Sequence, residues 1–254
     1  MYFPASSVPD EFSGRRALVT GGSRGIGAAV ARRLLDGGAR VVTSARSATA
    51  DTPRESDFIA GDLRSEPGAQ DLVERAVTAL GGLDILVNAA GASRAYMGGP
   101  ATVPDHEWQD SIDINFLSAV RVISASLPAL RESRDGAAIV NISTGAAKNP
   151  SPPVLHYAAA KAALASYSKG LAKALAPAGI RVNVVTPGPV DTPGGTEILQ
   201  TIADAMGVPL AALAGNVPLG RFGDPRDIAE AVTFLASSRA QWITGTELDV
   251  NGGQ

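Results

Sequence analysis

The chain has 254 residues, a formal net charge of −3 and no cysteine, so it suits one domain with a substantial core and excludes disulfides and thiolate chemistry. Its two histidines, His106 and His156, lie far apart without a metal-ligand pattern, so no metal site is expected. It has no basic stripe for nucleic acid, no run near the ~18 uncharged apolar residues of a membrane helix and no secretory signal, so we expect a cytoplasmic location.

Short apolar runs alternate with amphipathic segments along the chain. Residues 1–13 predict a loosely packed or disordered tail, and residues 14–254 a single domain. The predicted strands are Ala17–Thr20, Val41–Ser44, Asp57–Ala60, Ile85–Asn88, Ala138–Ile142, Arg181–Thr186 and Glu247–Val250. The predicted helices are Ile26–Asp36, Ala69–Leu80, Glu107–Arg131, Leu155–Ala176 and Arg226–Ala236. This alternation predicts an α/β fold, a doubly wound parallel sheet of about seven strands with helices on both faces.

A glycine-rich turn, TGGSRGIG at residues 20–27, follows the first predicted strand. Its glycines at 21, 25 and 27 would let the backbone approach a pyrophosphate closely. The helix that follows would offer free N–H groups and the positive end of its dipole. A glycine turn alone can be purely structural, but its place between a strand and a helix predicts a dinucleotide site.

Tyr157 and Lys161 are four residues apart, so they lie one above the other on a predicted helix face. A phenol loses its proton near pH ~10, and lowering that value by ~3 units requires about 4 kcal/mol. A positive charge ~4.5 Å away supplies roughly that amount at an effective dielectric of ~20. Many helices carry this spacing by chance as a solvated surface pair. The glycine turn upstream and the PGPVDT segment at 187–192 downstream favour a proton-transfer couple instead.

Several segments, in this order and spacing, resemble the short-chain dehydrogenase/reductase family over about Gly14 to Gly253. They are TGGSRGIG at 20–27, GDL at 61–63, LVNAAG at 86–91, Asn115, NIST at 141–144, YAAAK at 157–161, PGPVDT at 187–192 and TGTELDVNGG at 244–253. The resemblance implies a Rossmann-type fold. It also implies hydride transfer between a nicotinamide cofactor and a carbonyl or secondary alcohol, with a tyrosine as general acid and base.

The resemblance further implies which residues hold the cofactor. Asp62 and Leu63 match adenine contacts, and Val190 and Thr192 match residues that hold the nicotinamide carboxamide. Ala89 stands where the family usually has a second Asn, which removes one amide from the segment beside the adenosine. The full expected set is Gly21, Ser23, Arg24, Gly25, Ile26, Gly27, Arg46, Asp62, Leu63, Asn88, Ala90, Gly91, Tyr157, Lys161, Pro187, Gly188, Val190 and Thr192.

The end of the second predicted strand indicates which nicotinamide nucleotide binds. NAD-dependent enzymes commonly place an Asp or Glu there to bind the ribose hydroxyls, but this chain has Ala45 followed by Arg46. Arg24 points toward the same region in the family. Two guanidiniums without a carboxylate suit a 2′-phosphate, so NADP(H) is favoured over NAD(H), which is kept as the alternative.

Four side chains match the catalytic set that the resemblance implies: Asn115, Thr144, Tyr157 and Lys161. Thr144 occupies the place of the family's usual serine, thirteen residues before the tyrosine, and offers the same hydroxyl with an added methyl. Ser143 is the alternative, although alternation along a strand would point it the other way. Asn115 would hold a water that relays protons to Lys161, and its alternative role is a helix kink or a satisfied core amide.

Residues 193–216 interrupt the strand–helix rhythm and are interpreted as a substrate lid, with a plain surface insertion as the alternative. The segments expected around the substrate are mostly apolar, which favours a medium-sized, largely uncharged carbonyl or alcohol. A 3-oxoacyl-acyl-carrier-protein reductase is the second enzyme hypothesis. A non-catalytic NADP-binding protein and a methyltransferase are hypotheses of other kinds, and the intact Tyr157–Lys161 pair speaks against both. The long helices would form a homotetramer, or a dimer, as in most of the family.

Overall fold

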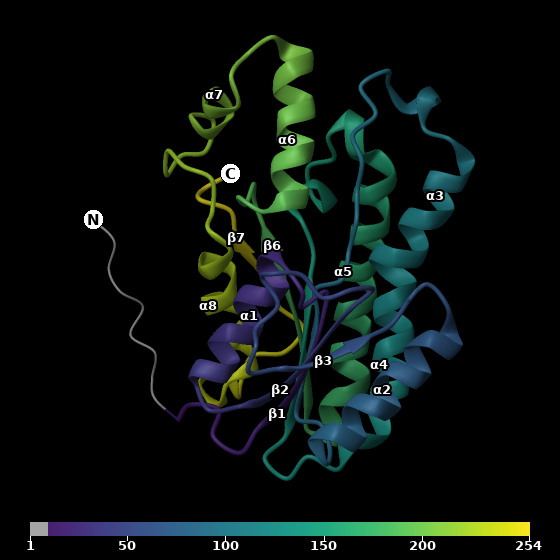
Figure 1. Cartoon of the computed structure of the whole chain (residues 1–254), viewed down its shortest axis with the longest axis vertical. Coiled ribbons are helices and arrows are strands. Elements are labelled where there is room, and N and C mark those ends of the chain that lie inside the picture. The colour runs from purple at the N-terminus through teal and green to yellow at the C-terminus, as the bar shows by residue number, and fades with distance from the viewer. Residues whose placement is uncertain (1–9) are drawn as a thin grey trace.

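Seven parallel strands form one sheet in the computed structural model, which describes residues 10–254 (Figure 1). The strand order is β3-β2-β1-β4-β5-β6-β7. The bounds are β1 Arg16–Thr20, β2 Arg40–Ala45, β3 Asp57–Ala60, β4 Ile85–Asn88, β5 Ala137–Ile142, β6 Ile180–Pro187 and β7 Glu247–Val250. Every residue of β5 is buried, as expected for a parallel strand covered on both faces. The predicted doubly wound α/β fold is confirmed.

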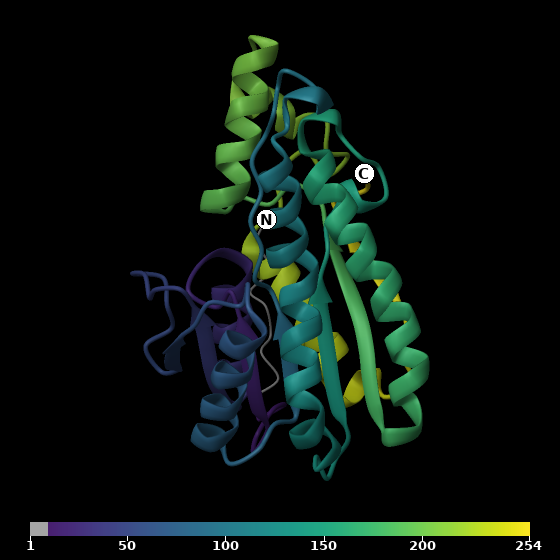
Figure 2. The same ribbon diagram turned by 90° about the vertical axis from the view of Figure 1, so that its right-hand side faces the viewer.

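Helices cover both faces of the sheet (Figures 1 and 2). One face packs against α1 (Gly25–Asp36) and α8 (Pro225–Ala236), and the other against α2 (Glu66–Leu80), α4 (Ser118–Arg131) and α5 (Leu155–Leu175). Helix α8 begins with a capping box in which the side chains of Asp224 and Asp227 satisfy backbone N–H groups, with Pro225 in the first turn. Helix α8 therefore starts where the sequence supplies a helix signal.

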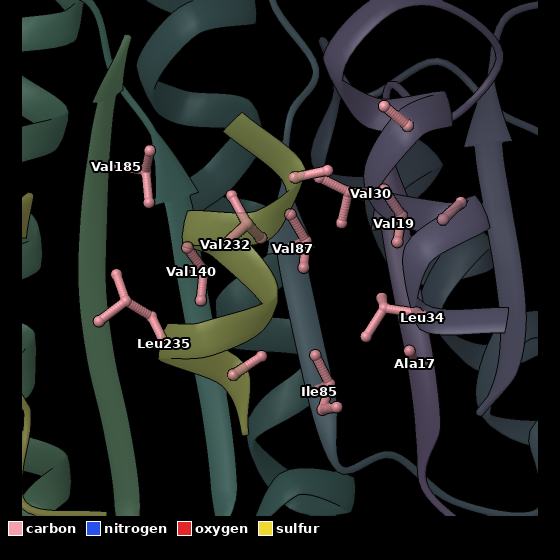
Figure 3. Packing of buried hydrophobic residues seen from close by; sticks show 14 of the residues in the cluster. Ala17, Val19, Val30, Leu34, Ile85, Val87, Val140, Val185, Val232 and Leu235 are labelled. Carbon is pink, nitrogen blue, oxygen red and sulfur yellow. The ribbon is translucent and has the colours of Figure 1, made fainter. Parts of the chain in front are cut away.

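The core between the sheet and the α1–α8 layer consists of interleaved aliphatic side chains (Figure 3). Val30 of α1 and Val232 of α8 lie over Val19, Val87 and Val140 of the central strands, and all five are fully buried. Burying one such side chain stabilises the fold by about 1.5–3 kcal/mol. This packing holds the carboxyl ends of the strands in fixed positions relative to one another.

The predicted helix Glu107–Arg131 begins earlier and has an interruption. It consists of α3 (Asp105–Ile112), a π-helical turn (Asp113–Leu117) and α4. By length and apolar composition alone, Asp105–Arg131 would also suit a membrane span, the one such helix among the described residues. In the fold it packs against α2 and α5 (Figure 2).

Residues 193–216 hold two helices that the sequence patterns did not predict, α6 (Pro193–Met206) and α7 (Leu210–Ala214). Thr192 caps α6 by accepting a hydrogen bond from the backbone N–H of Gly195 at 3.1 Å. Only Ala203 of α6 is buried, so this helix stands away from the sheet (Figure 1).

Residues 1–9 of the expected N-terminal tail lie outside the described residues. The remainder packs onto the domain, because Phe12 is 1% exposed within the α1–α8 core. Glu11 forms ion pairs with Arg33 of α1 and with Arg239, each at 2.8 Å. The packed structure therefore extends upstream of the expected boundary at residue 14.

Candidate active site and cofactor cleft

The sheet brings the expected site residues to a single edge. The chain proceeds outward from β1 to β2 and β3, then crosses back to β4 on the other side of β1. In open parallel sheets, ligands bind at the carboxyl ends of the strands at such a reversal. Each expected segment follows the carboxyl end of a strand: 20–27 after β1, 46 after β2, 62–63 after β3, 88–91 after β4, 144 after β5 and 187–192 after β6.

The glycine turn is packed too tightly for side chains. Gly21 has φ +68, and a Cβ there would lie 2.7 Å from the backbone of Ala89 and Ala90. A Cβ on Gly27 would lie 2.3 Å from the carbonyl oxygen of Gly21. These glycines therefore let the backbone of β1, of the segment after β4 and of α1 come into direct contact.

The amino end of α1 is open to an anion. Its N-cap residue, Arg24, is extended and makes no side-chain cap hydrogen bond, so the backbone N–H groups of the first turn are not capped by it. The Arg24 side chain is exposed, whereas Ser23 is buried. Ile26 packs against the core and fixes the first turn in place. A helix end without a side-chain cap beside a glycine-rich turn fits the pyrophosphate of a dinucleotide.

Arg46 lies exposed directly after β2, and no carboxylate stands at Ala45. The loop that follows is fastened to the glycine turn, because the hydroxyls of Thr49 and Thr52 donate hydrogen bonds to the carbonyl oxygen of Ser23 at 2.5 and 3.3 Å. Arg46 is therefore carried on a loop held against the turn, on the same edge as Arg24.

Asp62 is bound to a neighbour that the sequence patterns did not single out. Arg64 makes an ion pair with its carboxylate at 2.6 Å, and this hydrogen bonding holds the pKa of Asp62 at about 2. Leu63, between them, has its side chain buried in the core under α2 and α4. An arginine two residues after an aspartate was the available signal for this pair.

Asn88 links the centre of the sheet to α5. Its side-chain amide donates to Oδ1 of Asn141 at 2.8 Å, and Asn141 donates to Oγ of Ser168 at 2.9 Å. All three side chains are buried. This chain of hydrogen bonds links β4, β5 and α5, although Ala89 lacks the second amide that is usual in the family.

Lys161 is 3% exposed and donates a hydrogen bond from Nζ to the carbonyl oxygen of Ile142 at 2.8 Å. Burial lowers the pKa of Lys161 to about 8. Burial raises the pKa of the Tyr157 phenol, and a hydrogen bond with Thr144 only partly offsets it. The expected lowering of the Tyr157 pKa is therefore absent in the free protein. Desolvation penalises the phenolate, and the lysine cation is held by a backbone carbonyl.

Thr144 and Ser143 lie in different surroundings. Thr144 is half-buried, extended and hydrogen-bonded to Tyr157. The Ser143 hydroxyl is buried without a hydrogen-bond partner. Only Thr144 thus combines partial exposure with a contact to Tyr157.

Asn115 lies in the π-helical turn, and its amide makes three hydrogen bonds. It donates to the carbonyl oxygen of Ala92 at 2.8 Å and to Ser111 Oγ at 3.2 Å, and it accepts from the N–H of Ala92 at 3.1 Å. A Cβ on Gly91 would lie 2.9 Å from Asn115 Oδ1 and 3.5 Å from Lys161 Nζ. Asn115 is thus part of an irregular helical turn and is also a hydrogen-bonded core amide, which are the two alternative roles expected for it, and it lies beside Lys161.

The segment after β6 lies against the glycine turn. Thr192 Cγ2 would be 3.2 Å from a Cβ on Gly25, and a Cβ on Gly188 would be 2.9 Å from Asn251. Val190 is buried and pairs with Gly223. The segment that begins after Pro187, the last residue of β6, therefore lies beside the first turn of α1.

A doubly wound sheet with this glycine turn, helix end and hydroxyl–phenol–lysine cluster defines a dinucleotide-binding oxidoreductase. The sequence matches the family model described as Enoyl-(Acyl carrier protein) reductase over residues 21–254. The chain belongs to the short-chain dehydrogenase/reductase family, whose members act on CH–OH and C=O groups with a nicotinamide cofactor.

Named relatives differ in their substrates. A 3-oxoacyl-acyl-carrier-protein reductase of Haemophilus influenzae is 38% identical over 246 residues, which cover 94% of this chain and 98% of that protein. L-fucose dehydrogenase of Mus musculus is 36% identical over 251 residues, which cover 95% of this chain and 89% of that protein.

Solved structures agree over nearly the whole chain. The ligand-free aldohexose dehydrogenase of Thermoplasma acidophilum superposes with a TM-score of 0.86 at 28% identity, covering 96% of this chain and 95% of that one. A dehydrogenase/reductase from Sinorhizobium meliloti gives a TM-score of 0.84 at 32% identity, covering 99% of both chains.

Proposed function

We propose that the protein is an NADP(H)-dependent oxidoreductase that interconverts a ketone and a secondary alcohol through Thr144, Tyr157 and Lys161. The observation that carries this proposal is the contact between the Thr144 hydroxyl and the Tyr157 phenol, one helical turn from the buried Lys161, at the carboxyl end of β5. The glycine turn that would hold the cofactor pyrophosphate opens on the same edge.

Each residue has a distinct task in this proposal. When bound, the nicotinamide supplies the hydride in reduction and accepts it in oxidation. Thr144 and Tyr157 hydrogen-bond the carbonyl oxygen, where negative charge develops, and Tyr157 donates its proton to that oxygen. Lys161 binds the nicotinamide ribose hydroxyls and stabilises the phenolate. Asn115 keeps the segment after β4 against Lys161 and supports proton resupply through water.

The preference for NADP(H) rests on charge. Arg46 and Arg24 are exposed near the glycine turn, and the position that often carries an acidic residue is Ala45. A guanidinium pairs with a phosphate through charge-assisted hydrogen bonds, whereas an acidic side chain would repel it. NAD(H) use is the alternative.

The test is the absorbance of NADPH in the presence of a panel of ketones, with Tyr157→Phe as the matched variant. Wild type should turn over at least one ketone. Tyr157→Phe should lose activity by at least ~10² while binding NADPH normally in calorimetry, because general acid catalysis is typically worth 10²–10⁴. NADPH binding without turnover of any ketone would instead favour a non-catalytic NADP-binding protein.

A second candidate is reduction of a 3-oxoacyl group on acyl carrier protein. It is supported by the Haemophilus influenzae relative, and by one of that name from Vibrio cholerae at 36% identity over 247 residues. The two candidates separate when one 3-oxoacyl chain is offered on acyl carrier protein and on a small thioester. Preference for the protein-bound chain by tenfold or more in kcat/KM favours this candidate.

Assembly, location and the lid also belong to the proposal. Ala158, Ala165 and Ala172 of α5 are buried within the chain itself, so they pack inside the subunit. In its most apolar window, the helix Asp105–Arg131 is only 33% buried, which suits coverage by a second subunit in a homotetramer or dimer. We further propose a cytoplasmic location and a lid at residues 193–216, whose helix α6 is mostly unburied.

A further inference from the structure

Arg64 donates hydrogen bonds to both oxygens of the Asp62 carboxylate. Its backbone N–H and its Nε donate to Oδ1 at 3.0 and 3.1 Å, and Nη2 donates to Oδ2 at 2.6 Å. The two side chains are about half exposed, 48% for Asp62 and 47% for Arg64. The carboxylate that would accept a hydrogen bond from an adenine amine is therefore already occupied by a planar cation.

The backbone of Arg64 is held in place while its side chain is exposed. Arg121 of α4 donates to the carbonyl oxygen of Arg64 at 2.8 Å and also pairs with Asp113 at 2.9 Å. Asp110 and Asp113 lie near enough to attract the Arg64 guanidinium. A guanidinium released from Asp62 would therefore stay over this edge, and its release needs only side-chain rotation.

We propose that Arg64 is part of the adenine site. Without cofactor, its guanidinium is hydrogen-bonded to the Asp62 carboxylate. When the cofactor binds, Arg64 releases this carboxylate, which then accepts a hydrogen bond from the adenine amine, and the guanidinium stacks on the adenine ring. This proposal rests on the proposed cofactor site, in which Asp62 receives the adenine. It adds a residue outside the expected cofactor-binding set, and it separates recognition of adenine from recognition of the 2′-phosphate by Arg46.

The magnitudes favour this exchange. Breaking an exposed ion pair shifts an equilibrium by no more than about fivefold. Stacking of a base on an aromatic side chain shifts an equilibrium by about fivefold to a hundredfold, and cation–π contacts from Arg contribute in the same direction. Arg is the cation suited to such stacking, because its guanidinium is planar and weakly hydrated. Arg64 should therefore increase adenine affinity overall, although it competes for Asp62 in the free state.

Calorimetry with NADPH, NADH, 5′-AMP and nicotinamide mononucleotide tests the proposal on the full chain. Arg64→Ala should weaken the three adenine nucleotides by a similar factor, about fivefold to thirtyfold, and leave nicotinamide mononucleotide unchanged. Arg64→Lys keeps the charge beside Asp62 but lacks the planar group, so it should weaken them nearly as much. Arg75→Ala, which removes an equally exposed α2 arginine paired with Asp71 at 3.1 Å, is the matched control and should change nothing.

The outcomes are distinguishable. Adenine-nucleotide binding by Arg64→Ala equal to or tighter than wild type would overturn the proposal, because Arg64 would then be only a surface ion-pair partner or a competitor. A loss confined to NADPH would also overturn it, since the contact would be to the 2′-phosphate. Failure of wild type to bind any nicotinamide nucleotide would instead refute the proposed function.

Discussion

Lys161 of α5 is tied to the end of β5 by a 2.8 Å hydrogen bond from its Nζ to the carbonyl oxygen of Ile142. A cation that is 3% exposed is thus held by a neutral acceptor, and burial brings its pKa to about 8 from an ordinary value of 10.5. The folded protein therefore binds this proton less tightly than the unfolded chain does.

This arrangement predicts a stability difference that depends on pH. Burial of the charged lysine destabilises the fold fully below pH 8, and the effect disappears as pH rises to 10.5, where the unfolded chain also loses the proton. Lys161→Met should therefore gain stability over wild type at pH 7, by up to about 3 kcal/mol, and lose that advantage near pH 10.5. Urea unfolding of both proteins across this range is the measurement. An advantage that does not shrink with rising pH would contradict the prediction.

The Thr144 hydroxyl should matter for turnover. Thr144→Val keeps the side-chain shape but removes the hydrogen bond to the substrate oxygen, so kcat/KM should fall at least tenfold, as for one bond worth ~1.5–3 kcal/mol. Ser143→Ala removes only a buried hydroxyl that has no partner, so it should have little effect. Steady-state kinetics of both variants, with Thr144→Ser as the conservative control, provide the comparison. A larger loss in Ser143→Ala would transfer the role to Ser143.

Arg46 should determine the cofactor ratio. Arg46→Ala removes a charge-assisted contact worth ~1.5–3 kcal/mol and should weaken NADPH binding by one to two orders of magnitude, with little change for NADH. Ala45→Asp should shift the preference further toward NADH, because it adds repulsion against the 2′-phosphate and an acceptor for the ribose. The readout is the NADPH/NADH ratio of kcat/KM, with Arg54→Ala on the same loop as control. Wild type preferring NADH, or an unchanged ratio in Arg46→Ala, would refute this prediction.

His156, at the start of α5, predicts acid sensitivity. It is 1% exposed between Tyr96 and Trp108, with ring centroids 5.5 and 6.2 Å away, and neither ring nitrogen has a hydrogen-bond partner. Burial lowers the pKa of His156 below 6.5, and the charge of Glu107 only partly offsets this. As pH falls, the unfolded chain binds this proton at a higher pH than the folded protein does. The free energy of unfolding therefore decreases as pH falls below 6.5.

The variant His156→Leu should therefore lose less unfolding free energy than wild type between pH 7.5 and pH 5. His106→Leu, which removes an exposed histidine, is the control variant. Chemical unfolding of the three proteins at both pH values decides the matter. Equal pH dependence in wild type and His156→Leu would show that His156 does not contribute.

The sequence by itself determined the class of this protein. Gly21 and Gly27 stand where strand, turn and helix backbones meet without room for a Cβ, and Gly25 has a positive φ. Apolar runs and helix caps specify the strands and most helices locally. The four-residue spacing of Tyr157 and Lys161 places both side chains on one helix face by helix geometry alone.

The tertiary structure decided what depends on residues distant in sequence. Helix α6 was not predicted although Ile198, Leu199, Ile202 and Met206 recur at helical spacing, because Pro193, Gly194 and Gly195 at its start indicate a break in the strand–helix rhythm. The π-helical turn depends on Asn115 engaging Ala92 from another element, and the raised pKa of Tyr157 depends on burial by surrounding elements. Such properties are set by distances and desolvation in the folded molecule, which spacing along the chain does not encode.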